Sequence, residues 1–460
     1  MSRKPCGSVK SLAQPMPAGN LYTPHLGHLL DLFSSISAPN QTLLPRACLA
    51  WPMSERRFRV LAIASHPTQY GAPVFRLMAR HPRLDFQVAY CSMRGAEAAH
   101  DPEFGTTVKW DVPVLEGYDW THVPNHSSDS VLALRNPGLW PLIRQGKFDA
   151  ILCYISYRSP SFWYAKLAAR LSKAAFLFGT DAHTLTSLDG RKWKRHVKRA
   201  LWPLLFRLAD QLIVPSSGTF DLMISLGIPR ERVTLAPYCV DNDWWTSHAA
   251  QVNRNAVRAD WGAGPDTLVI LFCAKLQPWK RPSDLLHAFA KAALPNAILV
   301  FAGEGPLRAQ LEAHAAALGL TNRVRFLGFV NQSQLPAIYS SADLMVLPSS
   351  HEPFAVVVNE ALLCGCPVAA SDRVGAARDL LAPIAPDLVF PCGNMEALAA
   401  IFSSAAAHRA RLKNVAQSSA ALMQSWGPER NVAATLDAVH KATSRVRNSV
   451  ATSAARVSAN

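Results

Sequence analysis

A chain of 460 residues is too long for one ordinary hydrophobic core and fits two domains of typical size. Its 47 basic residues exceed its 32 acidic residues by 15, and this charge favours phosphate-bearing partners such as nucleic acid, anionic lipid or a nucleotide. No run approaches the roughly 20 apolar residues that cross a bilayer, which excludes a membrane-spanning helix. The nine cysteines form no CxxC pair, so we expect reduced thiols in a cytoplasmic protein and no metal site.

Residues 1–57 contain Pro and Ser throughout and no sustained hydrophobic period. The basic start is not followed by the apolar core of about 7–15 residues that a signal peptide requires. Met53 stands shortly before the first convincing strand. We therefore expect the fold to begin near residue 58, with residues 1–57 disordered or added by a misassigned start.

Short apolar runs alternate with longer helical patterns in residues 58–240, which is typical of a parallel α/β domain. The expected strands are 59–64, 86–90, 150–155, 175–178, 211–214 and 233–236. The expected helices are 72–79, 161–171, 192–208 and 219–226.

Residues 265–410 repeat this alternation. The expected strands are 268–274, 297–302, 324–326, 344–347 and 367–370, and the expected helices are 282–293, 306–318, 335–340 and 356–363. Turn residues and the Trp244-Trp245 pair place a linker at 241–264. We expect helices in 411–445 to return to the first domain and the tail, 446–460, to fray. The fold class is thus α/β, with two Rossmann-like domains facing across a cleft and ligands beyond the carboxyl ends of the strands.

Two glutamates follow the expected strand 344–347. Glu352 lies in the strand-to-helix loop, and Glu360 lies about two turns further along the helix. The backbone N–H groups of residues 354–357 (Phe354, Ala355, Val356, Val357) would be unpaired at the helix start, which favours an anion there. A loop carboxylate can accept from sugar hydroxyls, and one on the helix from a ribose diol. Alternatively, Glu352 caps the helix and Glu360 is a solvated side chain, and the pair alone does not decide.

Two lysines flank the loop after the expected strand 268–274. Lys275 ends the strand and Lys280 opens the next helix, so both cations project at the same edge of the sheet. Ammonium groups there would neutralise a diphosphate and the charge that builds on it as it leaves. A single lysine is usually a solvated surface charge. Two cations and two carboxylates at strand ends of one domain favour a binding site instead.

These segments, together with residues 301–306, 325–330 and 365–368, resemble the donor domain of the family 4 retaining glycosyltransferases, which have the GT-B fold. The resemblance covers residues 265–400 and implies transfer of a sugar from a nucleotide-diphosphate sugar to a hydroxyl of a glycan, lipid-linked or small-molecule acceptor. It also implies retention of anomeric configuration, no required cofactor, no metal and a place in polysaccharide biosynthesis.

The same resemblance implies the roles of individual residues. Glu352 should hold the transferred sugar, Glu360 the ribose, and Lys275 and Lys280 the diphosphate. The family usually has Arg at the first cation, and Lys275 keeps its charge without the bidentate fork. The remaining donor-site residues are Gly303, Glu304, Phe329, Val330 and, from the first domain, Gly71.

The acceptor side is expected in the first domain. His66, Gln69 and Gly71 belong to a segment that resembles the His-Pro-x-Gln-Tyr motif of some family members, although a turn without a ligand would also fit. Asp181 and His183 follow the expected strand 175–178 and could accept a proton or orient an acceptor hydroxyl. Many family members carry a histidine after the strand that matches 150–155, and this chain has none there.

A basic cluster opens the expected helix 192–208, which then turns apolar. Either this helix packs into the core with a solvated start, or it rests on an anionic membrane at the inner face. Two other classes of protein stay open: a sugar phosphorylase or epimerase of the same architecture, and a basic protein that binds nucleic acid or an anionic surface without catalysis. No nucleic-acid-binding motif is present, so we expect no nucleic-acid partner.

Overall fold

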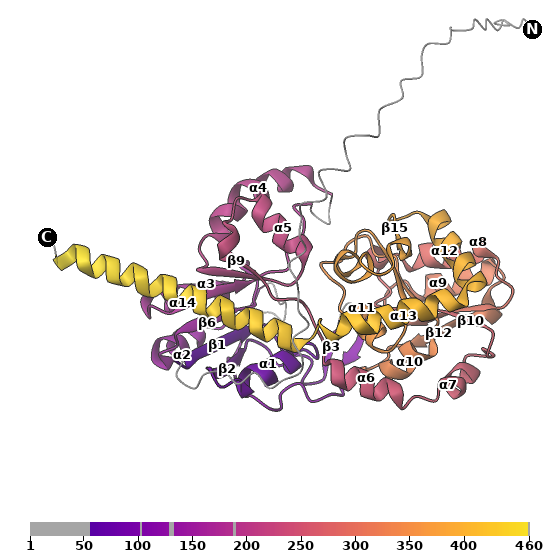
Figure 1. The fold of residues 1–460 in the computed structure, drawn as a ribbon, viewed down its shortest axis with the longest axis horizontal. Helices are drawn as coiled ribbons and strands as arrows, with labels where there is room; N and C mark the ends of the chain where they lie inside the picture. Colours follow the sequence, from indigo (N-terminus) through magenta and orange to yellow (C-terminus); the bar gives the residue numbers. More distant parts are fainter. Residues whose placement is uncertain (1–55, 102–103, 128–132, 187–189, 459–460) are drawn as a thin grey trace, which may run out of the picture. The chain divides into compact units, whose positions relative to one another are not determined.

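The computed structural model describes residues 56–101, 104–127, 133–186 and 190–458. The expectation for residues 1–57 therefore lies outside the described residues, apart from its last two positions. The described chain forms two domains, each built on a parallel sheet with helices on its faces (Figure 1).

The first domain has a seven-stranded sheet in the order β5-β2-β1-β6-β7-β8-β9, with every neighbouring pair parallel. Its central strands are almost entirely buried, as parallel strands covered on both faces are. The strands are β1 (Phe58–Ala64), β2 (Leu84–Tyr90), β5 (Asp119–His122), β6 (Ala150–Cys153), β7 (Ala175–Gly179), β8 (Gln211–Val214) and β9 (Val233–Leu235). The helices are α1 (Gly71–Arg80), α2 (Leu139–Gly146), α3 (Pro160–Leu171), α4 (Lys192–Phe206) and α5 (Ser217–Ser225). A separate antiparallel hairpin joins β3 (Ala99–Asp101) and β4 (Thr106–Val108).

The second domain has a six-stranded parallel sheet in the order β12-β11-β10-β13-β14-β15. The strands are β10 (Leu268–Cys273), β11 (Ala297–Ala302), β12 (Val324–Gly328), β13 (Leu344–Leu347), β14 (Val368–Ser371) and β15 (Val389–Phe390). The helices are α8 (Pro282–Ala292), α9 (Arg308–Ala317), α10 (Leu335–Ser341), α11 (Val357–Leu363), α12 (Met395–Ala407) and α13 (Arg409–Gln424). In both sheets the order reverses beside the first strand, so the α/β fold expected from the sequence is confirmed.

The segment 241–264, expected as a linker, is largely helical and belongs to the second domain. It contains α6 (Asn242–Ala250) and α7 (Arg254–Asp260), whose starts are capped by the side chains of Asp241 and Asn253. Trp245 and Trp261 are buried in the core of the second sheet. The tryptophan pair therefore marks a packed helix rather than a turn.

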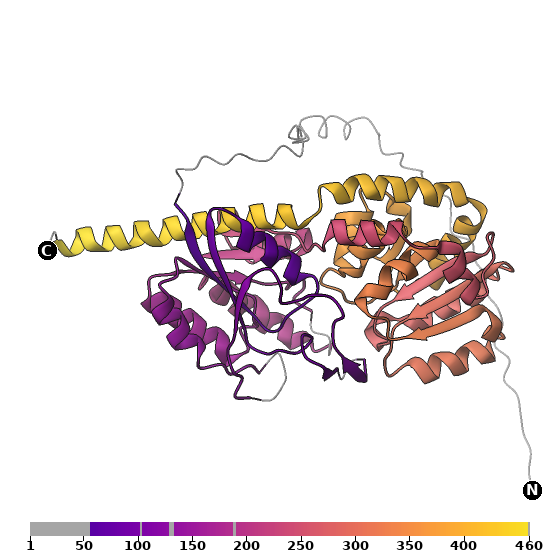
Figure 2. The ribbon, with the colours of Figure 1, turned by 90° about the horizontal axis from the view of Figure 1, so that it is seen from below.

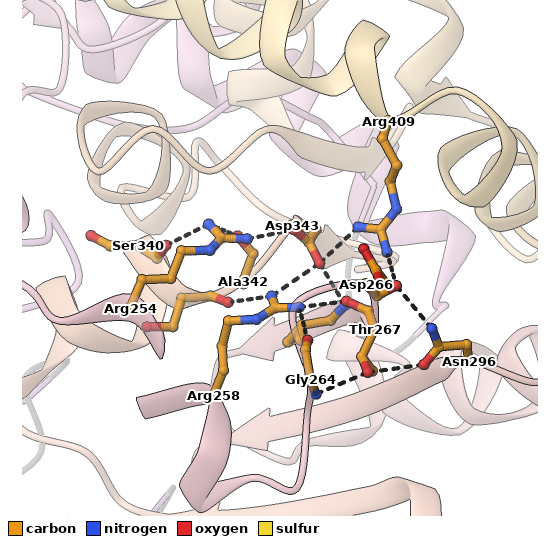
Figure 3. A network of polar contacts seen from close by, with 12 residues as sticks. Arg254, Arg258, Gly264, Asp266, Thr267, Asn296, Ser340, Ala342, Asp343 and Arg409 are labelled. Atoms are coloured by element: carbon orange, nitrogen blue, oxygen red, sulfur yellow. Dashed lines mark hydrogen bonds and ion pairs between the residues drawn. The ribbon is translucent and has the colours of Figure 1, made fainter. Parts of the chain in front are cut away.

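An arginine network fixes α7 and α13 to the amino ends of β10 and β13 in the second sheet (Figure 3). The Asp343 carboxylate, just before β13, contacts Arg254 at 2.5 Å, Arg258 at 3.2 Å and Arg409 at 2.9 Å. It also accepts from the backbone N–H of Val269 at 2.8 Å. Arg258 is buried and donates to the carbonyl groups of residues 264, 267 and 341 as well.

The C-terminal helix α14 (Pro428–Ser458) packs along the first domain, beside α1, β7 and β8 (Figure 2). Val432, Leu436 and Val439 are buried in the core of the first sheet. Arg445 donates to the carbonyl groups of Asp210 at 2.9 Å and Glu231 at 2.6 Å. The helix continues to Ser458, past the point where we expected fraying, because residues 446–458 contain neither Gly nor Pro.

Candidate active site

Loops that follow strands of both sheets contact each other between the domains. The rings of His183, after β7, and His351, after β13, have centroids 4.7 Å apart. Tyr238, after β9, packs against Phe354 with centroids 5.7 Å apart. Ligands of such sheets bind at carboxyl strand ends, so these loops define the candidate site.

Glu352 and Lys280, expected as members of one site, form a direct ion pair. Glu352 follows β13 and is largely buried, and Lys280 ends a 3₁₀ turn (Pro278–Lys280) after β10. The neighbouring loops also bond through their backbones, because Ser350 N–H donates to the carbonyl of Trp279 at 2.7 Å. The Lys280 ammonium group thus balances the charge of the Glu352 carboxylate.

The backbone around Glu352 is held in place by the loop after β14. Gly375 N–H donates to the Glu352 carbonyl at 3.1 Å, and Ala376 N–H to the Phe354 carbonyl at 2.8 Å. A Cβ atom at Gly375 would lie 2.1 Å from the Pro353 carbonyl oxygen, so this close approach requires glycine. Ala355 has a φ of 81°, a conformation that costs free energy in any residue with a side chain.

The start of α11 was expected to offer the backbone N–H groups of residues 354–357 to an anion, and this expectation stays a prediction. The Phe354 side chain is buried, and its ring stacks on Trp426 with centroids 6.3 Å apart. Val356 and Val357 begin a helix of only seven residues, and no side chain caps it. Its dipole is therefore small, and the nearby lysines are the stronger source of positive charge.

Glu360 is buried within the second domain. Its Oε2 accepts a hydrogen bond at 2.9 Å from the hydroxyl of Tyr339 on α10, and Tyr339 in turn contacts Cys273 at 3.2 Å. Burial raises the pKa of the Glu360 carboxyl group to about 7, and the hydrogen bond from Tyr339 opposes this rise. The alternative of a solvated Glu360 is therefore wrong.

Lys275 contacts the first domain. Its Nζ is 3.4 Å from Oδ2 of Asp101 at the end of β3, and 4.5 Å from the ring centroid of Phe104. Phe104 also packs edge-to-face on Phe329, with centroids 5.0 Å apart. The β3–β4 hairpin thus covers two expected donor-site residues, Lys275 and Phe329.

The loop after β11 lies beside the loop after β10. Gly303 has a φ of 152°, and a Cβ atom there would lie 2.0 Å from the carbonyl oxygen of Ala274, so only glycine fits. Glu304 is paired with Arg308 on α9, and its carbonyl accepts from Leu276 N–H at 2.8 Å. Val330 packs against the apolar core of the second sheet.

On the acceptor side, His66, Gln69 and Gly71 lie in or beside the loop between β1 and α1. His66 Nδ1 is 2.9 Å from the hydroxyl of Ser65. Burial, followed by the nearby Arg94, lowers the pKa of His66 to about 4, so the ring is neutral at pH 7. Gly71 N–H donates to Thr68 Oγ1 at 3.1 Å, which closes the turn into α1.

Asp181 lines a pocket of about 170 Å³ at the carboxyl ends of β6 to β9. Tyr154, Thr180, Tyr238 and, from α14, Asn431 are among its other walls. Asp181 is an exposed residue, yet desolvation of its carboxyl group by the surrounding protein raises the pKa of that group. The pocket therefore combines one carboxyl group with aromatic and hydroxyl surfaces, which suits a small polyhydroxylated ring.

Several residues of the site were missed by sequence reasoning. Tyr238 follows β9, and its place at a strand end was the available signal. Asp101 and Phe104 lie on a hairpin too short to show a periodic pattern, and Tyr339 looks like an ordinary core residue of α10. Only the tertiary fold brings these side chains to the lysines and glutamates.

Two features are absent from the part of the chain that the structure describes. No cluster of three His, Cys, Asp or Glu side chains there is arranged to hold a metal ion. None of the helices there has both the length and the apolar character to cross a bilayer.

The fold and the site define the class of GT-B glycosyltransferases. Anabaena Alr3699/HepE in complex with UDP-glucose is similar in fold, with a TM-score of 0.62, 19% identity and coverage of 83% of this chain and 100% of that chain. A Rickettsia africae glycosyltransferase gives a TM-score of 0.62 at 14% identity, with coverage of 84% and 98%. At these identities the likeness concerns the fold alone.

The sequence matches two families: "Glycosyl transferases group 1" over residues 253–420 and "Glycosyl transferase 4-like domain" over residues 70–239. The chain belongs to the family 4 glycosyltransferases. D-inositol 3-phosphate glycosyltransferase of Mycolicibacterium smegmatis is 36% identical over 170 residues, which are 35% of this chain and 38% of that protein. 2-Deoxystreptamine glucosyltransferase of Streptomyces kanamyceticus is 32% identical over 180 residues, 39% of this chain and 46% of that protein. Each match spans less than half of the relative.

Proposed function

We propose that this chain transfers a sugar from a nucleotide-diphosphate sugar to an acceptor hydroxyl, with retention of anomeric configuration. The observation that carries the proposal is the ion pair of the buried Glu352 with the partly buried Lys280 at the carboxyl ends of the second sheet, with Lys275 on the same loop as Lys280. Family membership and the UDP-glucose complex of a structural neighbour support the donor class.

Each donor-side residue has a distinct role in this proposal. Lys280 and Lys275 neutralise the diphosphate and the negative charge that grows on it as the glycosidic bond breaks. Lys280 also fixes Glu352, whose carboxylate accepts from hydroxyls of the transferred sugar and so aligns the reacting carbon. Glu360 accepts from the ribose once it has lost its proton. The proposal requires no cofactor and no metal.

The acceptor binds in the pocket of Asp181 in this proposal. The carboxyl group of Asp181 orients an acceptor hydroxyl, and Tyr238 links the pocket to the Glu352 loop through Phe354. His183 and the neutral His66 follow strands of the same sheet and supply further hydrogen-bonding groups in this proposal. The acceptor in this proposal is a glycan, a lipid-linked sugar or a small polyol. Transfer to such an acceptor is consistent with a role in polysaccharide biosynthesis.

Incubation with a panel of radiolabelled nucleotide sugars tests the proposal, with hydrolysis or transfer as the readout. Glu352→Ala should lower turnover at least about 100-fold, because it removes the group that positions the sugar. Lys280→Ala should raise the donor KM, since it removes a diphosphate contact. Glu312→Ala, which removes an exposed carboxylate of α9, is the matched control and should be silent. Full activity of Glu352→Ala would place the site elsewhere, and an inverted product seen by NMR would refute retention.

We also propose that the first domain rests on an anionic membrane surface through α3 and α4. Along α4, the apolar side chains of Trp193, Val197, Leu201 and Leu204 are between 42% and 64% exposed. The helix packs on the core of the first sheet through Trp202 and Phe206, as one of the two interpretations of the sequence predicted, and most of its other apolar residues stay exposed. On α3, Trp163, Leu167 and Leu171 form a second exposed row at helical spacing.

Charge and apolar surface occur together on α4. The cations are Arg191, Lys192, Lys194, Arg195, Lys198 and Arg199, and the helix carries no acidic residue. Basic residues beside exposed Trp and Leu suit the interface of an anionic bilayer. The described cysteines are all free thiols, which agrees with a place on the cytoplasmic face.

Co-sedimentation with phosphatidylglycerol vesicles tests the membrane proposal. Charge reversal at Lys192, Arg195 and Arg199 should reduce binding at least about 10-fold, since each cation near the surface contributes about 1 kcal/mol. Reversal of exposed Lys291 and Lys413 in the second domain is the control and should change little. Equal binding of both variants, or wild-type binding to phosphatidylcholine alone, would refute electrostatic docking. If the exposed apolar residues of α3 and α4 are instead buried in a dimer, sedimentation velocity without lipid would show that dimer.

A further inference from the structure

A carboxylate of the first domain contacts Lys275, the lysine to which the proposed function gives a role in binding the diphosphate. Asp101 Oδ2 lies 3.4 Å from Lys275 Nζ, and the side chains are only 15% and 24% exposed. The Lys275 ammonium also lies 4.5 Å from the centroid of the Phe104 ring. Asp101 and Phe104 come from the β3–β4 hairpin, whereas Lys275 follows β10 of the other domain.

The Asp101 carboxylate is held in position by contacts other than Lys275. Arg94 lies 2.9 Å from the same oxygen, Oδ2, and Oδ1 accepts from the N–H of Phe104 at 3.2 Å. Asp101 therefore keeps a cationic partner when Lys275 moves away. This makes exchange of the Lys275 ammonium between two anions inexpensive, because no buried charge is stranded.

The hairpin region is also fixed to the second domain beside Lys275. Phe104 packs on Phe329, and Asn331 Nδ2 donates to the carbonyl of Lys109 at 2.8 Å. Ser333 N–H donates to the carboxylate of Asp111 at 3.1 Å. These contacts hold the hairpin region, and Asp101 with it, beside Lys275.

Two anions can therefore compete for the Lys275 ammonium group. A nucleoside diphosphate is an anion, so it meets repulsion from Asp101 and must share or take over the Lys275 ammonium. We propose that Asp101 competes with the diphosphate of the donor and of the released nucleotide for Lys275. The contact keeps nucleotide binding weak enough for product release, a step that often limits turnover. This inference rests on the proposed role of Lys275 in diphosphate binding.

Asp101→Asn in the full chain tests the competition, because it keeps the shape and removes the charge. Binding of UDP, ADP, GDP and inorganic pyrophosphate is measured by calorimetry at low salt. The variant should bind the preferred nucleotide about 3- to 10-fold more tightly, and pyrophosphate should show the same gain because the effect acts through charge. Unchanged or weaker binding would overturn the proposal.

A double-mutant cycle identifies the partner of Asp101. In a Lys275→Met background, Asp101→Asn should no longer tighten binding, whereas a gain that persists would assign the effect to Arg94 or to direct repulsion by Asp101 and refute the competition for Lys275. Asp111→Asn is the matched control, since it removes a negative charge of the same region but keeps a side-chain oxygen that accepts from Ser333 N–H, and it should leave affinity unchanged. A wild-type chain that binds none of the four probes would refute the proposed function itself, while wild-type binding with no gain in Asp101→Asn refutes only the competition.

Discussion

Glu360 is a carboxyl group with almost no contact with solvent, and burial raises its pKa from an ordinary value of 4.5 to about 7. In the unfolded chain the carboxyl group has its ordinary pKa, so it loses its proton at a lower pH than in the folded chain. Between these two values the folded chain binds more protons than the unfolded chain, so this group lowers the free energy of unfolding as pH rises. Its unfavourable contribution is complete above about pH 7.

Glu360→Gln should remove that pH dependence. The amide oxygen still accepts from Tyr339, but no charge has to be buried at high pH. We expect the free energy of unfolding of the variant, relative to wild type, to increase from pH 5 to pH 8 by at most about 3 kcal/mol. Urea unfolding at both pH values measures it. The same slope in both proteins would show that Glu360 ionises normally in the fold.

The proposed ribose contact makes a separate kinetic prediction. A ribose diol donates two hydrogen bonds, which the ionised carboxylate accepts better than the protonated acid. Donor kcat/KM should therefore rise several-fold as pH increases through about 7, and Glu360→Gln should flatten this rise. Initial rates at subsaturating donor between pH 5.5 and 8.5 measure both. A rise that survives in the variant belongs to another group.

At the scale of elements, the loop before α11 contains a conformation that its residue does not favour. Ala355 has a φ of 81°, and glycine adopts such backbone without cost. Ala355→Gly should raise the free energy of unfolding by about 1 kcal/mol, after the greater freedom of glycine in the unfolded chain is counted. Ala376→Gly is the control: its φ is −63°, so glycine there should destabilise by about 1 kcal/mol. Thermal unfolding of both variants distinguishes strain from a general tolerance of glycine.

The elements recovered from the sequence are those with a strong apolar signal. The strands β8, β11 and β13 match the expected bounds to the residue, since each is an unbroken buried run. The edge strand β5 and the helix α7 were missed because their residues are mixed in polarity. What defines them is pairing with a neighbour and a capping side chain, and neither shows as a period.

The site residues also divide into those that could be predicted from the sequence and those that could not. Glu352 and Lys280 were placed together because parallel strands end at one edge of a sheet, and their ion pair agrees with that rule. The burial of Glu360 depends on how α10 packs on α11, and the contact of Lys275 with Asp101 depends on the other domain. Pairings across such sequence distances leave no trace in spacing, so sequence reasoning could not find them.

The network around Asp343 gives an element-scale prediction for stability (Figure 3). Asp343→Asn removes the charge that Arg254, Arg258 and Arg409 share, and Arg258 is buried. Leaving a buried guanidinium without its carboxylate should cost about 3 kcal/mol. Asp387→Asn breaks an exposed pair and should cost less than about 1 kcal/mol. Urea midpoints compare the two, and equal small losses would mean that backbone carbonyls alone satisfy Arg258.

At the scale of the whole molecule, the chain's last helix completes its first domain. α14 follows α13 of the second domain, yet its buried residues, Val432, Leu436 and Val439 among them, belong to the core of the first sheet. Burial of such side chains contributes roughly 1.5–3 kcal/mol each, a large part of a domain's net stability. The first domain should therefore depend on a segment that lies far from it in sequence.

A chain that ends after Gly427 should keep a folded second domain and lose the stability of the first. Calorimetry should show an early transition that is absent from the wild type, and limited proteolysis should leave a resistant fragment that starts near residue 241. Nucleotide binding should persist because Lys280, Glu352 and Glu360 all lie in that fragment. A chain that ends after Asn448 keeps the buried part of α14 and is the control. Wild-type unfolding of the shorter chain would show that α14 covers the first sheet without stabilising it.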